Sequence, residues 1–416
     1  CADELGRTGV CTIRRATHDY RLCASRPTSK MIVNGFVHFW SRTEVSGVLA
    51  GVATALGMAV LILLQTGCDE PDTPSSNERT GQKELKRPQR PDSPRPYHVE
   101  KVTFRGAGGV ELTGILSRPV GEGPFPGVVL VHGSGPANRD YEIRGHRFFQ
   151  VLADYLTRHG TAVLRYDKRG IGNSEGTFAS ADHKTLARDA AAALRLLKNW
   201  SIVDAAKSGV MAHSEGGLVA SRMHLRHERA SFLVLLAPLA TPGYHSLPRQ
   251  HARRTSLAGA PDSVVDSLRL VRRRIAEAVR SATDSAEIIQ RVKAIYRRRG
   301  ASVEEFQEFA ESSLTASSRD FIRSTPRQWY RNLDVPVFVL YGENDIMVEP
   351  ERNADSIQAA LQKSATKEVT VRVIEDLNHW MQPAETGRVH EIAQTDTTID
   401  SEVLEKVTAW INRREE

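Results

Sequence analysis

The stretch GVMAHSEGGLVA at residues 209–220 decides how this chain is interpreted. An apolar, strand-like run leads into Ser214, and a helix-like run follows it, so the serine falls on a sharp turn between a strand and a helix. Such a turn strains the serine backbone and accepts only small residues two positions before and after it. Those positions hold Ala212, where glycine is usual, and Gly216. The stretch predicts that Ser214 is presented as a nucleophile at the end of a strand.

A second strand and a glycine-rich loop lie upstream. The apolar run at residues 127–131 indicates a buried strand, and it continues directly into His-Gly-Ser-Gly-Pro. We expect one backbone donor for a developing oxyanion from Gly133 or Ser134. A second donor would be the N–H of Glu215, at the start of the following helix, where the helix dipole also favours negative charge. Without Ser214, the same loop would be an ordinary glycine-rich turn.

Two further candidates come later in the chain, each just after a predicted strand. Asp345 follows the apolar run at residues 335–341, and His379 follows a second run at 369–374. A lone histidine after a strand is more often structural, but the order Ser214, Asp345, His379 favours a catalytic set. In that set the histidine takes the serine proton during attack on a carbonyl carbon, and the aspartate orients the ring. The mechanism requires no metal and no organic cofactor.

The elements between these motifs predict a mostly parallel sheet with helices on both faces. Residues 98–104 and 110–116 alternate with period two, which indicates an antiparallel pair that opens the sheet. From residue 127 onward strands and helices alternate, and such alternation requires crossover connections. Predicted strands cover 161–166 and 232–236, and predicted helices cover 148–159, 186–200 and 403–411. Residues 167–170, Asp-Lys-Arg-Gly, are interpreted as a turn held by a local ion pair rather than as catalytic.

A long insertion separates the strand at 232–236 from the strand at 335–341. Residues 243–331 are too many for a simple loop, and their helical spacing predicts a helical cap over the active-site mouth. The insertion carries 17 Arg and Lys against 10 acidic residues. Such a basic segment could favour anionic substrates, acidic lipid headgroups or nucleic acid, but we interpret it as solvated arginine faces. The sequence has no zinc-finger spacing, RNA-binding aromatic signature or P-loop, so no nucleic-acid partner is expected.

Four motifs carry a resemblance to a known family. They are GSGPANRD at 133–140, LRYDKRGIGNS at 164–174, HSEGG at 213–217 and LNH at 377–379. With them the chain resembles bacterial α/β-hydrolases, and within that superfamily the carboxylesterases whose oxyanion loop reads GSGPxxRD, often labelled serine-aminopeptidase-like. The resemblance covers roughly residues 98–416. It implies an α/β-hydrolase fold and hydrolysis of carboxylic esters with short acyl chains. The implied triad is Ser214, Asp345 and His379, and the implied oxyanion region is Gly133, Ser134 and Glu215.

Two other functions remain open at this point. A serine aminopeptidase or amidase could use the same triad, but it would need an acidic anchor for a free amine, such as Glu304, Glu305, Glu308 or Glu311 in the cap. A non-catalytic binding protein would be expected to have a damaged triad, and the intact one argues against it. The physiological substrate and the oligomeric state are not determined by the sequence.

The N-terminal quarter has a different composition. Residues 1–44 are interpreted as leader or translated upstream sequence, with Met31 or Met58 as candidate starts. The uncharged run Val45–Gly67 is long enough to span a bilayer and is followed by Cys68. It is either a lipoprotein signal acylated at Cys68, with an imperfect lipobox, or a transmembrane anchor. Both alternatives predict an extracytoplasmic, membrane-anchored bacterial enzyme whose domain follows a flexible linker at residues 69–97.

Cysteine placement and length limit the remaining possibilities. All four cysteines lie at or before residue 68, so the predicted domain at 98–416 has no disulfide, no cysteine-ligated zinc and no cysteine nucleophile. About 320 of the 416 residues remain for that domain, which suits one large α/β unit with an inserted cap. The expected partner is a small-molecule ester.

Overall fold

The computed structural model of the protein describes residues 87–413. The predicted leader, the anchor with Cys68, and the predicted linker up to residue 86 lie outside these residues. Within the described part, none of the helices combines the length and the apolar character needed to cross a bilayer.

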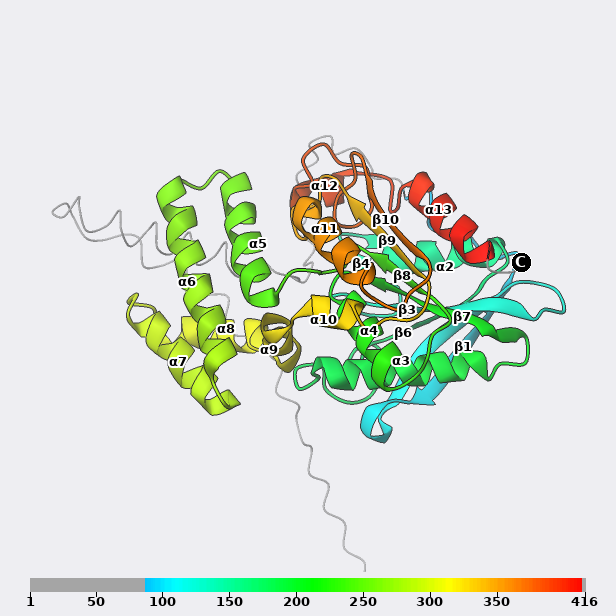
Figure 1. Ribbon diagram of the computed structural model, residues 1–416, viewed down its shortest axis with the longest axis horizontal. Helices are drawn as coiled ribbons and strands as arrows, with labels where there is room; N and C mark the ends of the chain where they lie inside the picture. Colours follow the sequence, from blue (N-terminus) through cyan, green and yellow to red (C-terminus); the bar gives the residue numbers. More distant parts are fainter. Residues whose placement is uncertain (1–86, 414–416) are drawn as a thin grey trace, which may run out of the picture. The chain divides into compact units, whose positions relative to one another are not determined.

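An eight-stranded sheet forms the centre of the described part (Figure 1). Its first two neighbouring pairs, β1 with β2 and β2 with β6, are antiparallel, and every later pair is parallel. The predicted mostly parallel sheet opened by an antiparallel pair is therefore confirmed. In spatial order the strands are β1 (His98–Arg105), β2 (Glu111–Arg118), β6 (Ala162–Tyr166), β3 (Phe125–Val131), β7 (Val203–His213), β8 (Leu233–Leu236), β9 (Val337–Gly342) and β10 (Val369–Ile374).

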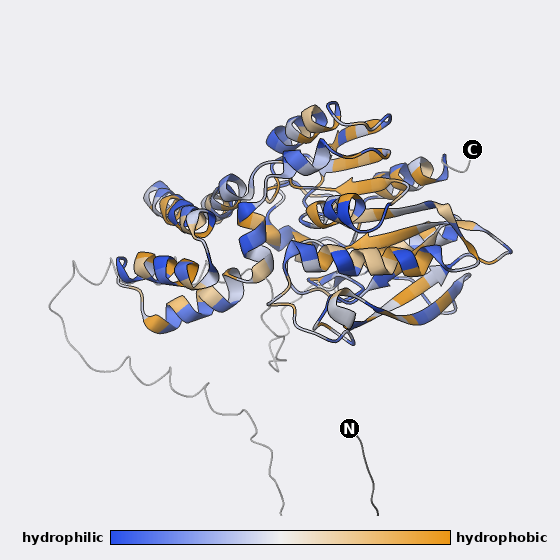
Figure 2. Ribbon diagram, turned by 60° about the horizontal axis from the view of Figure 1, so that its bottom comes forward, coloured by the Kyte–Doolittle hydropathy of each residue, from blue (hydrophilic) through white to orange (hydrophobic). Residues whose placement is uncertain are grey.

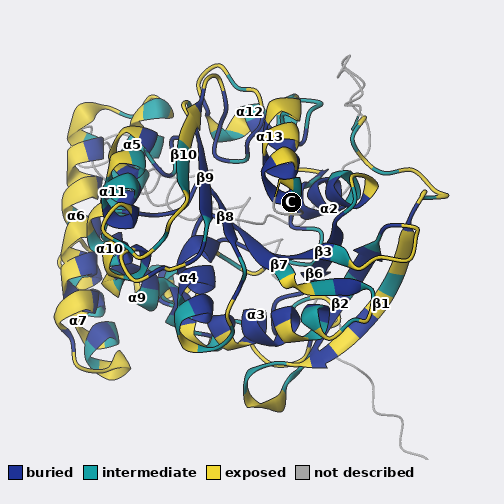
Figure 3. Cartoon of the chain, turned by 45° about the vertical axis from the view of Figure 1, so that its right-hand side comes forward, coloured by how far each residue is buried: buried dark blue, intermediate teal, exposed yellow. Residues whose placement is uncertain are grey.

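Helices cover both faces of this sheet, and the strands between them are the most hydrophobic part of the structure (Figure 2). Helices α2 (Phe148–Arg158) and α13 (Ser401–Asn412) lie on one face, and α3 (His183–Lys198) and α4 (Gly216–Arg226) lie on the other (Figure 3). Trp410 of α13 stacks on Phe338 of β9 with ring centroids 5.4 Å apart. Burial of such large rings between helix and sheet contributes about 1.5–3 kcal/mol for each side chain.

The position of the site follows from the strand order. The chain leaves β3 to form β6 on one side of it and later returns to form β7 on the other side. The connections therefore diverge at β3, and ligands of open α/β sheets bind beyond the carboxyl ends of the strands at such a point. The loop at residues 132–136 follows β3, and Ser214 follows β7.

Residues 243–330, inserted between β8 and β9, form six helices, of which α5 to α9 are on the left of Figure 1 and α10 is near its middle. Five of the six arginines in the two basic triplets, 272–274 and 297–299, are exposed, as expected for solvated faces. The exception is Arg272, which is buried with its guanidinium 5.0 Å from the ring centroid of Phe309. The helices are α5 (Gly243–Leu257), α6 (Asp262–Ser281), α7 (Ser285–Arg297), α8 (Val303–Ser313), α9 (Ala316–Arg323) and α10 (Pro326–Tyr330).

The described end of the predicted linker is attached to the domain. The Gln89 side chain donates to the carbonyl oxygen of Ile399 at 2.6 Å and accepts from the Thr398 N–H at 2.7 Å. The Tyr97 hydroxyl donates to Asp154 of α2 at 2.7 Å. Residues 87–97 thus belong to the folded domain, which begins earlier than the predicted boundary at 98.

Candidate active site

Ser214 occupies the tight turn between β7 and α4 that the sequence predicts. Its φ of 54° lies in the left-handed region, which a serine adopts only when the surrounding structure requires it. The Ser214 N–H donates to the carbonyl oxygen of Leu236 at 2.8 Å, which fixes the turn to β8. A Cβ on Gly216 would lie 2.6 Å from the carbonyl oxygens of Val131 and His132, so only glycine allows α4 to approach β3 this closely.

The three predicted side chains meet in one hydrogen-bonded row. The Nε2 atom of His379 lies 3.1 Å from the Ser214 Oγ, and its Nδ1 lies 2.7 Å from the Asp345 Oδ2. The other carboxylate oxygen of Asp345 accepts two backbone N–H groups, from Met347 at 2.7 Å and Val348 at 2.8 Å. Because a carboxylate only accepts, Nδ1 of a neutral His379 carries the proton and Nε2 is free to take one from the serine.

The oxyanion loop lies directly against the nucleophile. A Cβ on Gly133 would be 3.0 Å from the Ser214 Cβ and 2.6 Å from the Tyr141 hydroxyl oxygen, so glycine is required there. The Gly133 N–H donates to that hydroxyl at 3.1 Å. Of the two donors predicted from this loop, Gly133 is therefore engaged within the protein, and Ser134 is the candidate that remains.

Sequence reasoning missed a hydrogen-bonded chain that joins this loop to the base. The Tyr141 hydroxyl lies 3.4 Å from the Nδ1 of His213, and the His213 Nε2 lies 2.9 Å from the carbonyl oxygen of His379. The pKa of His213 lies well below its ordinary value of 6.5, so its ring is neutral. Burial is the main cause, and the nearby His379 is the second. A carbonyl only accepts, so Nε2 is the protonated nitrogen and Nδ1 is the one that can accept from Tyr141.

The residue after the nucleophile carries a buried carboxylate. Glu215 pairs with His183 and accepts from the hydroxyl of Ser317, a residue of cap helix α9, at 2.7 Å. Burial raises the pKa of Glu215, but attraction to His183 and Lys168 and hydrogen bonds from His183 and Ser134 outweigh burial and lower it to about 2. The ionised carboxylate therefore links the cap and helix α3 to the nucleophile turn.

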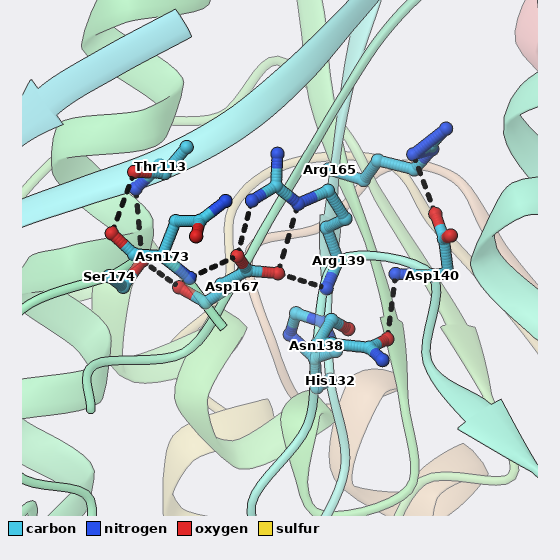
Figure 4. A network of polar contacts seen from close by, with 9 residues as sticks. All are labelled: Thr113, His132, Asn138, Arg139, Asp140, Arg165, Asp167, Asn173 and Ser174. Carbon is cyan, nitrogen blue, oxygen red and sulfur yellow. Dashed lines mark hydrogen bonds and ion pairs between the residues drawn. The ribbon is translucent and has the colours of Figure 1, made fainter. Parts of the chain in front are cut away.

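Two of the resembling motifs are joined by crossed ion pairs behind the oxyanion loop (Figure 4). Asp167 accepts from the Arg139 side chain and also from the Arg139 N–H at 2.6 Å. Arg165 donates to Asp140 at 2.8 Å. The turn at 167–170 is thus held by ion pairs, but the prediction that they are local was wrong. Asp167 pairs with Arg139, 28 residues away, and Arg169 pairs with Asp189 of α3, 20 residues away.

A cavity of about 330 Å³ lies next to the acid loop. Its walls come from three segments: the chain after β8, cap helix α5, and the residues that follow Asp345. Leu239, Pro242, Met347 and Val348 supply apolar surface, and His245 and Arg249 add polar groups. Residues 87–413 contain no group of three or more His, Cys, Asp or Glu side chains that could hold a metal ion.

The chain matches the family model described as Hydrolase_4, serine aminopeptidase S33, over residues 127–385. Esterase EstD of Thermotoga maritima is 26% identical over 318 residues, which cover 76% of this chain and 68% of EstD. Esterase FrsA of Enterobacter sp. is 28% identical over 174 residues, 42% of this chain but only 38% of FrsA. The solved structure of the Pyrococcus furiosus esterase Pf2001 aligns with a TM-score of 0.48 and 17% identity, over 80% of this chain and 99% of that one. The chain therefore belongs to the Hydrolase_4 (serine aminopeptidase S33) family of α/β-hydrolases and is an esterase-like member of it.

Proposed function

We propose that this protein hydrolyses carboxylic esters through the triad Ser214, His379 and Asp345. The observation that carries the proposal is the hydrogen-bonded row, with 3.1 Å from the Ser214 Oγ to the His379 Nε2 and 2.7 Å from Nδ1 to Asp345. Both distances are those required of a nucleophile, its base and the group that orients the base. The similarity to EstD and FrsA supports an ester as the substrate.

Each step of the reaction has a group to perform it. The Ser214 Oγ attacks the ester carbonyl while the His379 Nε2 takes its proton, and Asp345 stabilises the imidazolium. The N–H groups of Ser134 and Glu215 hold the oxyanion. The intermediate collapses as His379 returns the proton to the leaving alcohol, and water then releases the acyl group from the serine by the same route. Loss of one oxyanion donor costs on the order of 100-fold or more in rate.

Acidic groups that could anchor the free amine of a peptide are not aimed at the described cavity. Glu304, Glu308 and Glu311 are exposed on helix α8, and Glu305 caps the same helix. The carboxylate that does line the cavity belongs to Glu349, and Arg249 and Arg352 lie 3.0 and 3.2 Å from it. Because arginines surround this carboxylate, it is a poor site for a substrate ammonium.

The expectation of short acyl groups rests on the resemblance of the four motifs and not on the cavity, because neither Ser214 nor His379 lines the cavity. We expect activity to fall as the acyl chain lengthens.

The proposal is tested with the 416-residue chain, Ser214→Ala and a matched control, on p-nitrophenyl esters from acetate to dodecanoate and on aminoacyl p-nitroanilides. The control is Ser221→Ala, a buried serine of α4 whose hydroxyl only donates to the Gly217 carbonyl oxygen within its own helix, at 2.8 Å. We expect turnover of short esters by the parent and the control, and none by Ser214→Ala. Equal ester turnover by all three proteins would reject the triad, and faster anilide cleavage would assign a peptidase. A folded parent inactive on the whole panel would support a binding protein.

Membrane attachment and an extracytoplasmic location remain predictions from residues 45–68. Globomycin sensitivity of processing would separate a lipoprotein at Cys68 from a transmembrane anchor.

A further inference from the structure

Lys168 is a buried cation that contacts the backbone of the oxyanion loop. It follows β6, and the residue is only 5% exposed. Its Nζ donates to the carbonyl oxygen of Gly133 at 2.6 Å and to that of Gly135 at 2.7 Å. The ion pairs of Asp167 and Arg169, on either side, hold the turn that carries it. One ammonium group thus contacts two peptide units of the loop that the proposed mechanism uses.

These contacts determine the direction of a particular N–H group. The Gly133 carbonyl and the Ser134 N–H belong to the same peptide unit, which is planar and trans, so they point in opposite directions. Because the carbonyl faces Lys168, the Ser134 N–H faces away from it. The loop itself borders the nucleophile, since a Cβ on Gly133 would be 3.0 Å from the Ser214 Cβ.

We propose that Lys168 is a positioning residue that aims the Ser134 N–H at the oxyanion formed on Ser214. The inference rests on the proposed function, because it assigns a role in the same reaction. Preorganised donors of this kind are effective because no reorganisation is needed when charge develops. The ammonium also polarises the Gly133–Ser134 peptide, which makes its N–H a stronger donor.

The charge of Lys168 has a counterpart on the other side of the loop. Glu215 carries a buried carboxylate whose pKa is lowered to about 2, and attraction to Lys168 is among the causes. Ser134 is also among the groups that lower this pKa. Lys168 thus contacts the peptide of one proposed donor and attracts the carboxylate of Glu215, whose own N–H is the second proposed donor.

The test compares Lys168→Met, which keeps most of the side-chain volume, with Lys168→Arg, which keeps donors for the two carbonyls. We expect Lys168→Met to lower kcat by about 10- to 100-fold, because a misdirected Ser134 N–H stabilises the oxyanion only partly or not at all. KM should change by less than about threefold. The affinity for a trifluoromethyl ketone, which forms a tetrahedral adduct with the serine, should fall by the same factor as kcat/KM. Lys168→Arg should recover part of kcat.

A matched control separates positioning from stability. Lys198→Met removes a partly buried ammonium at the C-terminal end of α3, which donates to the Arg229 carbonyl oxygen and pairs with Glu228 at 3.1 Å. It should lower the thermal midpoint while kcat per folded molecule stays within about threefold of the parent. A Lys168→Met protein with parental kcat, or with unchanged affinity for the ketone, would overturn the inference. If Lys168→Met does not fold, Lys168→Gln is tested in the same way. Loss of activity in Lys168→Met but not in Ser214→Ala would instead reject the proposed triad.

Discussion

The Nε2 of His213 lies 2.9 Å from the carbonyl oxygen of His379, so the residue before the nucleophile holds the backbone of the residue proposed as the base. Trp380 stacks on the same His213 ring, with centroids 4.8 Å apart and planes 29° apart. The imidazole of His379 must face both Ser214 and Asp345. The hydrogen bond from His213 to the His379 carbonyl restricts the loop that carries this imidazole. Proximity catalysis depends on that restriction.

His213→Phe is therefore expected to reduce activity without removing any atom of the triad. Phenylalanine fills the ring space but has no N–H for the His379 carbonyl, and one such bond contributes about 1 kcal/mol, or roughly fivefold in rate. Steady-state kinetics on a short ester would measure a lower kcat with little change in KM. His224→Phe is the control, because His224 is equally buried in α4 but bonds to Asp334. A parental kcat in His213→Phe would reject this role.

The ion pair between Arg139 and Asp167 should be among the more stabilising contacts of the domain. The Asp167 side chain is 2% exposed. Burial raises the pKa of this carboxyl, but hydrogen bonds from Arg139 and Asn173 outweigh burial and lower the pKa below its ordinary value. Asp167→Asn leaves the partly buried guanidinium of Arg139 without its charge partner, which should cost about 2–4 kcal/mol, somewhat less than the loss of a partner in a fully buried pair. Urea unfolding at pH 7 would measure the loss. Glu100→Gln, in the more exposed pair with Arg118, should cost less than about 1 kcal/mol. Equal effects of the two changes would contradict the prediction.

Gly216→Ala tests the close approach of α4 to β3. The added methyl would lie 2.6 Å from two backbone carbonyl oxygens, which cannot move as a flexible side chain would. We expect a loss of about 1–3 kcal/mol in the free energy of unfolding, with displacement of Ser214 and loss of most activity. Gly217→Ala, at the next position, meets the Pro238 Cβ at 3.0 Å and the Tyr330 hydroxyl at 3.3 Å, both of them side-chain atoms, and should be milder. Thermal melting and ester assays on both variants would decide, and equal tolerance would show that the turn adapts.

Most strands could be predicted because each is an apolar run bounded by turn residues. The helix predicted at 148–159 ends at Arg158, and the strand predicted at 369–374 has those bounds in the structure. The start of the domain could not be predicted in the same way. Gln89 lies in a proline-rich, polar stretch without periodicity, and its attachment depends on backbone groups near Ile399 that are distant in sequence.

The proposed triad was accessible to sequence reasoning because each residue follows its own strand in a fixed order. The residues that surround the proposed triad could not be found from the sequence in this way. Lys168 was interpreted as part of a turn held by a local ion pair, and only the fold brings it to the carbonyls of a loop more than 30 residues away. His213 was noted only as a neighbour of Ser214. Pairwise contacts between segments that are far apart in sequence leave no local pattern, so they require the tertiary structure.

Stability should decrease in mild acid because of histidines buried in the neutral form. The pKa of His132 is lowered from 6.5 to about 3, mainly by burial and secondly by the charge of Lys168. The folded state therefore resists a proton that the unfolded chain accepts below pH 6.5. The contribution of neutral His132 to stability is complete above pH 6.5 and is lost progressively as the pH falls toward 3.

Between pH 6.5 and 5 this single group should remove about 2 kcal/mol from the free energy of unfolding, at 1.36 kcal/mol for each pH unit. His213, whose pKa is also lowered by burial, acts in the same direction. His132→Phe keeps an aromatic ring beside Phe149 and Tyr166 and cannot titrate. Urea unfolding at pH 7 and pH 5 should therefore give a smaller loss for His132→Phe than for the parent. The same loss in both proteins would mean that other groups, and not His132, determine the response to acid.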